Sequence, residues 1–392
     1  MIYINEINTA GKIAVDDTIL VKDVPATAGS KMLENFKPLF SAEVVERLEK
    51  SGYSVSGKTN VGEFGLDLLG ETSFFAPETK DGNLVGSAAE LVASGKVKAA
   101  LNVDLNGAPR RASAVSGVDF IKPTYGTVSR YGIIACACSG EQIGVTAANA
   151  DDAKEILSVI AGHDSKDGTS LPAEKYEYSA DESVADMKIC IIKELYDAAS
   201  DETKARIDAF SEKIQEKGAS VEMVSLDIAS QAQTAWQILM AAETTNNLSR
   251  FDGVKFGYRT PEYKNIDELY VKSRSEAMCF LTKATIIYGS DVLAKAKYEK
   301  CYDKSLRIRR IVCDKTRELL SKYDAILAPA CSQTSYRPYD ISEAFEKVFE
   351  ESFFTAIPSI TGMPAMVTKG VQLISDSYKE SVLLSIAKSA EV

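Results

Sequence analysis

The sequence predicts an α/β protein in which one sheet is covered by helices on both faces. Stretches typical of strands and of helices alternate along the chain, as expected for repeated strand–helix–strand units. Residues 187–195 form a compact apolar strand of the kind that is buried on both faces of a sheet. No stretch rich in proline, glycine and serine divides the 392 residues, so residues 1–392 are predicted to form a single domain.

The N-terminal part is predicted to contain an extended segment over residues 13–21, followed by a helix over residues 41–52. The helix is indicated by apolar side chains at helical spacing and a glycine after them, namely Val44, Val45, Leu48 and Gly52. A strand over residues 98–103 is predicted to lead into the loop that follows it.

A second short helix is predicted over residues 86–95. Ser87 is interpreted as its N-cap, with Glu90 three residues later as the capping-box partner. Gly95 marks its end.

The middle of the chain predicts a strand–helix–strand unit with parallel strands. Its parts are the strand at 187–195, a helix over residues 200–218 and a strand over residues 219–226. The helix carries its apolar positions at Ile207, Phe210 and Ile214 and stops at Gly218.

Three further elements follow the same patterns. A helix is predicted near residues 151–161, and a long helix over residues 305–324 leads into a strand over residues 325–330 that Pro329 closes. His163, the single histidine, follows the first of these helices in a polar stretch that is predicted to be a loop. Any serine–histidine or cysteine–histidine mechanism would have to use this residue.

The composition narrows the classes of function. The formal net charge is −11 and the pI is near 5.0, which argues against a primary nucleic-acid binder, because phosphates require a basic face. No apolar run is long enough for a membrane span, and the N-terminus lacks the features of a signal peptide. No metal or other cofactor is predicted.

The seven cysteines lie mostly in apolar segments and form no CxxC pair, which indicates free thiols in a reducing cytoplasm. Cys136 and Cys138 alternate along an apolar stretch, so both are predicted to point to one face of a strand. A redox or metal pair at these two positions is the alternative interpretation, although no further ligands cluster nearby in the sequence.

Residues 102–117, NVDLNGAPRRASAVSG, have the form of a loop that presents a reactive side chain. The loop contains an acid at Asp104, a turn at Asn106 and Gly107, and then paired arginines. The residue after the turn is Ala108, whose methyl group offers no chemistry.

Three stretches of the chain resemble the amidase-signature family: GKTNVGEFG (57–65), KPTYGTVSRYG (122–132) and residues 142–171. Within this family the chain is most similar to the glutaminase subunits of glutamyl-tRNA(Gln) amidotransferases, and the resemblance extends over nearly its whole length. It implies the family's fold, a large mixed, mostly parallel sheet covered by helices on both faces. It also implies that the family's upstream helical segment is absent and that the C-terminal part is shortened.

The resemblance implies a mechanism in which a neutral lysine accepts a proton from a bridging serine in a cis peptide, which in turn activates a nucleophilic serine. The lysine falls on Lys58 in GKTN, the bridging serine on Asn83 and the nucleophile on Ala108, whereas Asp104 and Gly107 are retained. Neither an amide nor a methyl group can replace a hydroxyl in this chemistry. We therefore expect no amidase activity by the family mechanism.

The resemblance also places substrate-binding roles on retained residues. Tyr258 and Arg309 match the positions that hold the backbone groups of glutamine, and Gly107 belongs to the loop that supplies oxyanion-hole amides. An arginine can bind a carboxylate through two parallel hydrogen bonds. The alternatives are a solvent-facing basic cluster around Arg309 and a structural Lys58 whose ammonium bonds loop carbonyls.

Three functions remain open from the sequence. The first is a non-catalytic homologue that binds a partner or senses an amide. The second is a working amidase or amidotransferase subunit with a relocated nucleophile, for which the candidates are Ser87, Ser113, Ser116 and Ser139. The third is a stabilising subunit of a tRNA-dependent amidation complex. The predicted partners are glutamine or another small amide and an amidotransferase-type subunit, without direct contact to nucleic acid or membrane.

Overall fold

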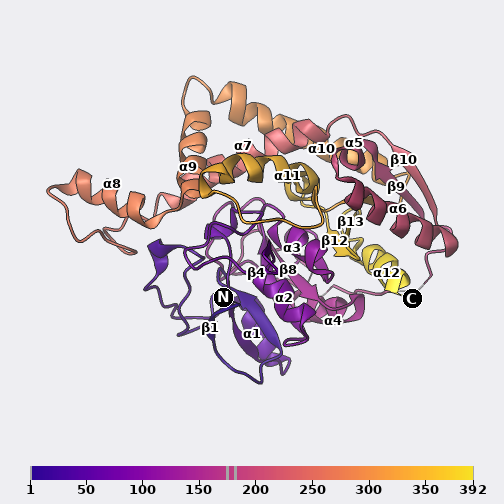
Figure 1. The fold of residues 1–392 in the computed structure, drawn as a ribbon, viewed down its shortest axis with the longest axis horizontal. Helices are drawn as coiled ribbons and strands as arrows, with labels where there is room; N and C mark the ends of the chain where they lie inside the picture. The colour runs from indigo at the N-terminus through magenta and orange to yellow at the C-terminus, as the bar shows by residue number, and fades with distance from the viewer. Residues whose placement is uncertain (1, 174–175, 181–182, 392) are drawn as a thin grey trace.

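The computed structural model describes residues 2–173, 176–180 and 183–391, and it confirms the predicted α/β fold (Figure 1). One mixed sheet of 11 strands runs through the described part of the chain in the order β1-β3-β2-β6-β8-β7-β12-β13-β11-β9-β10. Its strands are β1 (Tyr3–Glu6), β2 (Ile13–Asp16), β3 (Val55–Thr59), β6 (Ala99–Asp104), β7 (Asp119–Lys122), β8 (Gln142–Ala147), β9 (Lys188–Ile192), β10 (Ser220–Val224), β11 (Ala325–Pro329), β12 (Ala365–Thr368) and β13 (Val371–Ile374). Strands from both halves of the chain join this sheet. That residues 1–392 form a single domain stays a prediction.

The helices of the described residues connect and cover these strands. They are α1 (Glu43–Lys50), α2 (Ser87–Ala93), α3 (Ala108–Ser116), α4 (Ala150–Ile160), α5 (Lys193–Ala198), α6 (Asp201–Glu216), α7 (Ala229–Leu248), α8 (Ile266–Ala277), α9 (Phe280–Leu293), α10 (Lys304–Leu320), α11 (Ala344–Thr361) and α12 (Glu380–Glu391). Figure 1 shows α8 projecting from one end of the molecule. Within the described ranges, no helix combines the length and apolarity needed to cross a bilayer.

The expectation of a mostly parallel sheet was wrong. Antiparallel strand pairs outnumber parallel ones. The antiparallel pairs are β1–β3, β6–β8, β8–β7, β7–β12, β12–β13 and β13–β11, and the parallel pairs are β3–β2, β2–β6, β11–β9 and β9–β10. The parallel pairs lie toward the two ends of the sheet. In its middle, β12 and β13 are joined by the short turn Lys369–Gly370, a connection that only antiparallel neighbours allow.

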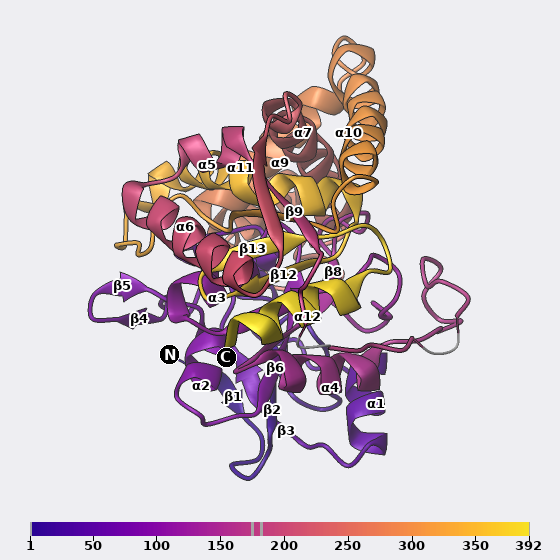
Figure 2. The same ribbon diagram turned by 90° about the vertical axis from the view of Figure 1, so that its right-hand side faces the viewer.

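Helices cover both faces of the sheet, as predicted. Successive residues of a strand point to opposite faces, and on β11 the side chains of Ile326 and Ala328 join one apolar cluster while Ala325 and Leu327 join another. The first cluster is completed by α3, α7 and α11, and the second by α1, α4, α6 and α12. Figure 2 shows α11 on one side of β12 and β13 and α12 on the other.

Most predicted elements are present. The helices predicted at 41–52, 86–95, 151–161, 200–218 and 305–324 are α1, α2, α4, α6 and α10, and the strands predicted at 98–103, 187–195, 219–226 and 325–330 are β6, β9, β10 and β11. The strands β9 and β10 are parallel with α6 between them, as the strand–helix–strand pattern requires. The last residues of 187–195 belong to α5, and the extended segment at 13–21 is a strand only as far as Asp16.

Two local predictions were wrong. Ser87 is the first residue of α2 and not its N-cap, which is Gly86, and no side chain caps this helix. Cys136 and Cys138 lie in a turn and not on a strand. The turn is favoured because the Glu141 carboxylate accepts hydrogen bonds from the backbone N–H groups of Cys136 and Ala137, which no described strand partner binds.

The buried carboxyl of Asp119 on β7 gives a prediction about pH. Burial raises the pKa of Asp119 from 3.8 to about 7, so the folded protein keeps a proton that the unfolded chain releases. The stabilisation from this proton is complete below pH 4 and is lost as the pH rises to about 7.

The side chain of Asp119→Asn stays neutral at every pH. As the pH rises from 4 to about 7, we expect the free energy of unfolding of this variant to increase relative to that of the wild type by about 1.4 kcal/mol per pH unit. The measurement is urea unfolding of both proteins at several values between pH 4 and pH 8. Parallel stability curves would show that Asp119 is ionised in the folded protein.

Candidate functional site

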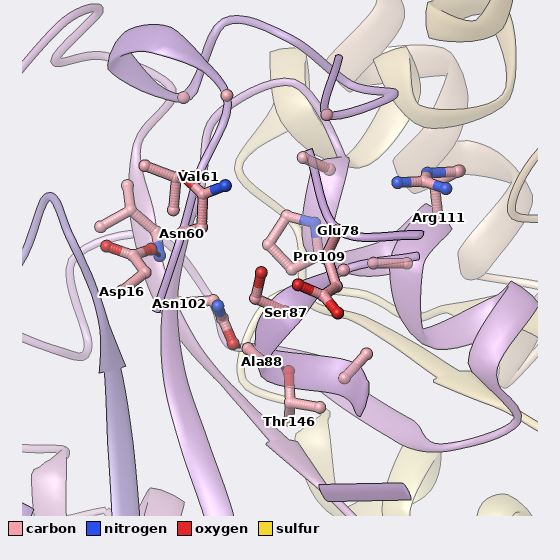
Figure 3. Close-up of a pocket in the computed structure, with 18 of the residues that line it drawn as sticks. Asp16, Asn60, Val61, Glu78, Ser87, Ala88, Asn102, Pro109, Arg111 and Thr146 are labelled. Carbon is pink, nitrogen blue, oxygen red and sulfur yellow. Dashed lines mark hydrogen bonds between the residues drawn. The ribbon is translucent and has the colours of Figure 1, made fainter. Parts of the chain in front are cut away.

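A cavity of about 80 Å³ lies beside the N-terminus of α3 (Figure 3). Ala108 is part of its wall. Because β2 runs parallel to β3 and to β6, the loops that follow these three strands meet at one edge of the sheet. Such an edge is where open α/β sheets bind their ligands. The cavity is small and lined by both polar and apolar groups, with room for a few water molecules or one small polar group.

The loop before α3 is held by a buried ion pair. Asp104 at the end of β6 accepts a hydrogen bond from the backbone N–H of Gly107 at 2.9 Å and pairs with the Arg110 guanidinium at 2.7 Å. Arg110 is fully buried and also donates to the carbonyl of Thr355 and to the hydroxyl of Ser359 on α11. The frame that presents Ala108 is thus anchored both to its own strand and to a helix distant in sequence.

Gly107 is the one residue type that fits its position. It is the N-cap of α3 with φ of 100°, a left-handed conformation that favours glycine. A Cβ atom there would also lie 2.4 Å from Cγ2 of Thr355. Its N–H is already bonded to Asp104, so the predicted oxyanion-hole role of Gly107 stays a proposal.

Asn106 connects this loop to α7. Its side-chain oxygen accepts from the indole N–H of Trp236 at 2.9 Å and from Gln237 at 3.4 Å, and its carbonyl accepts from Thr355 at 2.8 Å. Asn106, Trp236 and Gln237 are all buried. The loop is therefore rigidly positioned by groups that do not face the cavity.

The structure does not place Lys58 in this cavity. Its ammonium donates to the carbonyl of Ile19 and lies 3.7 Å from the carboxylate of Asp17, and all of its side chain is buried. Burial lowers the pKa of Lys58, while Asp17 and Asp16 oppose this shift. Across the β2–β3 pair, Lys58 lies beside Val15 and Thr59 lies beside Asp16. Because successive side chains of a strand point to opposite faces of the sheet, Lys58 and Asp16 lie on opposite faces.

Asp16, and not Lys58, reaches the cavity that Ala108 lines. One carboxylate oxygen accepts from the N–H of Val103 at 2.6 Å, and the other accepts from the N–H and the hydroxyl of Thr18. Burial raises the pKa of Asp16, and these hydrogen bonds oppose the shift. The sequence reasoning missed this residue, although the last residue of the first strand in a parallel set is a recognisable signal.

Two polar atoms face the cavity without a partner. The hydroxyl of Ser87, whose residue is 4% exposed, points into the cavity and has no hydrogen bond to any described residue (Figure 3). Asn102 accepts at Oδ1 from Thr146 at 2.9 Å, and its Nδ2 has no acceptor among residues 2–173, 176–180 and 183–391. Buried polar groups are normally satisfied, so these atoms are available to a ligand or water.

Arg111 forms another part of the wall. Its guanidinium donates to the carbonyls of Leu68, Leu69 and Leu84 at 2.9–3.2 Å. These bonds tie the loop after β3 to the hairpin of β4 (Thr79–Lys80) and β5 (Asn83–Leu84). Both of the paired arginines noted in the sequence therefore have structural roles: Arg110 holds the loop before α3, and Arg111 holds the segments beside the cavity.

The other predicted site residues lie elsewhere. Asn83 is on β5 opposite Lys80 and does not line the cavity. Tyr258 donates to Glu276 at 2.7 Å with the Lys31 ammonium over its ring, and Arg309 is half-buried on α10; neither lines the cavity. His163 lies in the predicted loop, with its Nδ1 3.0 Å from the carbonyl of Leu171.

Of the other serine candidates, none lines the cavity. The hydroxyls of Ser113 and Ser116 are buried on α3, and Ser139 donates its hydroxyl to Glu243. The described residues contain no group of histidine, cysteine, aspartate or glutamate side chains that could hold a metal ion.

Comparison with known proteins identifies the family. The amidase family pattern matches residues 12–384, which is most of the chain. The chain belongs to the amidase-signature family. It is 34% identical to the glutamyl-tRNA(Gln) amidotransferase A subunit of Sulfurihydrogenibium sp., over 96% of this chain and 81% of the relative, and 36% identical to the corresponding protein of Agathobacter rectalis, over 97% and 79%.

A solved structure agrees with this assignment. This amidase-signature chain superposes on the glutamyl-tRNA(Gln) amidotransferase A subunit of Thermotoga maritima with a TM-score of 0.81 and 27% identity, covering 97% of this chain and 82% of the other. The predicted family and the closeness to these amidotransferase subunits are thereby confirmed.

Proposed function

We propose that this amidase-signature protein binds a small amide in the Ala108 cavity without hydrolysing it. The observation that carries the proposal is the cavity wall itself. Where the resemblance expects a nucleophilic serine, the wall has the methyl group of Ala108, and the described lining residues include neither a lysine nor a histidine. An alcohol requires a base within hydrogen-bond reach to become a nucleophile. The position of the family's nucleophile therefore offers a bound amide no hydroxyl.

The groups that face the cavity suit a primary amide. Such a ligand has a carbonyl that accepts hydrogen bonds and an NH₂ that donates them. The Nδ2 of Asn102 and the hydroxyl of Ser87 can donate to the carbonyl, and the carboxylate of Asp16 can accept from the NH₂. The glutamine-binding roles that the resemblance implies for Tyr258 and Arg309 are not part of this proposal, because neither residue lines the cavity.

The proposal includes a partner protein. The relatives are named as one subunit of an amidotransferase, which supports an amidotransferase-type partner for this chain. The cysteines of the described residues are all free, which supports a location in the reducing cytoplasm. The net charge of −11 is consistent with a protein that leaves contact with tRNA to its partner.

A thermal-shift titration with glutamine, asparagine and propionamide tests the proposal. A ligand at 100 times its dissociation constant should stabilise the folded protein by about 2.7 kcal/mol. Asn102→Leu should remove the shift, because it deletes the free donor, whereas Asn8→Ala, an exposed asparagine outside the cavity, should leave it unchanged. No shift with any of the amides would contradict amide binding.

One observation favours a second function, an amidase with altered catalytic residues. Ser87 has a free hydroxyl directed into the cavity, and the carboxylate of Glu78 also lines the cavity (Figure 3). A serine beside a carboxylate can act as a nucleophile if the carboxylate accepts its proton. Ammonia release that Ser87→Ala abolishes would establish this alternative.

A further inference from the structure

A second pocket of about 500 Å³ lies apart from the Ala108 cavity and shares no lining residue with it. Its walls are mostly apolar and come from Leu20 and from three segments: the residues around the short helix η1 (Lys31–Leu33), residues 133–134, and the loop after α7. The large apolar lining residues are Leu20, Met32, Leu33, Phe36, Ile133, Ile134, Phe251 and Phe256. This volume and this lining are typical of sites for small organic molecules.

The walls of this pocket are fixed by hydrogen bonds and by ring packing. The N–H of Tyr258 donates to the carbonyl of Met32 at 2.8 Å, which joins two of the three segments. The rings of Phe251 and Phe256 meet edge to face with centroids 5.8 Å apart. Gly257 has φ of 87°, and a Cβ atom there would lie 2.8 Å from Sδ of Met32. The pocket is therefore preformed and does not depend on a ligand to open it.

Both charged side chains that line the pocket are cationic. Lys37 and Arg250 are exposed, and neither forms an ion pair with a described residue. Arg250 donates to the carbonyl of Ala135 at 2.7 Å and lies over the ring of Phe251, which leaves other N–H groups for a ligand. In a chain with a net charge of −11, the lining of this pocket carries two cations and no anion.

We propose that this pocket binds a small amphipathic carboxylate, with its apolar chain against the phenylalanine rings and its carboxylate between Lys37 and Arg250. The apolar lining accounts for the chain and excludes a fully polar metabolite. The two cations account for the carboxylate, since a guanidinium and an ammonium both bind carboxylate oxygens. Phe256 is 47% exposed, and the bound molecule would cover part of its ring.

Calorimetric titration of the full chain with decanoate tests this inference. We expect saturable binding of one decanoate per chain, about 4-fold tighter for each methylene added from octanoate to decanoate, because each buried methylene contributes about 0.8 kcal/mol. Decan-1-ol, which lacks the charge, should bind about 5-fold more weakly. Added salt should weaken binding of decanoate and leave binding of decan-1-ol unchanged.

Two kinds of variant locate the site. The double variant Lys37→Gln/Arg250→Gln should reduce decanoate binding to the level of decan-1-ol, whereas Lys12→Gln/Arg310→Gln, which removes exposed cations elsewhere, should have no effect. Ile133→Trp should fill the pocket and abolish binding of both compounds. The absence of saturable binding, equal affinity for acid and alcohol, or binding that survives both Ile133→Trp and the double variant would each overturn the inference.

Discussion

Replacing Asp104 by alanine is expected to lower the free energy of unfolding by about 3–5 kcal/mol, because it leaves the Arg110 guanidinium buried without its counter-ion. Arg110 would keep its bonds to Thr355, Gln372 and Ser359, but these partners carry no charge. The N–H of Gly107 would lose its acceptor as well. Chemical denaturation followed by circular dichroism measures the change.

The control for this variant is an ion pair at the surface. Asp303→Ala removes the partner of Arg307 on an exposed helix turn, where both side chains are about half exposed or more. This change should cost less than about 1 kcal/mol, because water solvates both charges in the variant. Similar losses for the two variants would show that the Asp104–Arg110 pair does not hold the loop before α3.

Trp236→Ala is expected to cost about 3–5 kcal/mol of stability, the range for deleting a buried aromatic side chain. The ring is 2% exposed, and it packs so closely on Gly140 that a Cβ atom at this glycine would lie 2.0 Å from the indole. The substitution also removes the N–H that Asn106 accepts. Denaturation followed by circular dichroism is suitable, since Trp236 is the single tryptophan and its fluorescence disappears with it.

A graded substitution separates the two contributions of Trp236. Trp236→Phe keeps most of the apolar volume and deletes the indole N–H, so it should cost about 1–3 kcal/mol. Phe74→Ala, at a ring that is 50% exposed, should change stability by less than about 1 kcal/mol. Equal costs for Trp236→Phe and Trp236→Ala would mean that the hydrogen bond to Asn106, and not the packing, dominates.

The sequence predicted elements well where a single local pattern decides the structure. The helix α6 has its cap at Ser200 and its apolar positions at Ile207, Phe210 and Ile214, so its limits follow from neighbouring residues alone. The sheet was predicted less well, because the direction of a strand depends on partners that are distant in sequence. Residues 365–368 and 371–374 pair with each other and with strands from the first and second halves of the chain, and no local pattern contains that information.

The candidate site was predicted in part. Residues 102–117, predicted as a loop, are the end of β6, a turn of three residues and the helix α3. This stretch does border a cavity, and Ala108 lies in its wall. Lys58 was placed there by a short motif, but the motif does not state which face of the strand its lysine occupies, and pairing with β2 directs it to Asp17 and Ile19. Ser87 was interpreted as a cap because its spacing to Glu90 fits a capping box, whereas Glu90 instead pairs with Lys80.

The most direct test of the central claim is ammonia release from glutamine, asparagine and propionamide, measured together with labelling by a serine-directed fluorophosphonate probe. The wild type and Ala108→Ser/Asn83→Ser should release no ammonia above the buffer rate, because the Lys58 amine is not part of the cavity wall, and the wild type should remain unlabelled. Ammonia release by the wild type that is lost in Ser87→Ala, with stoichiometric labelling at Ser87, would contradict the account.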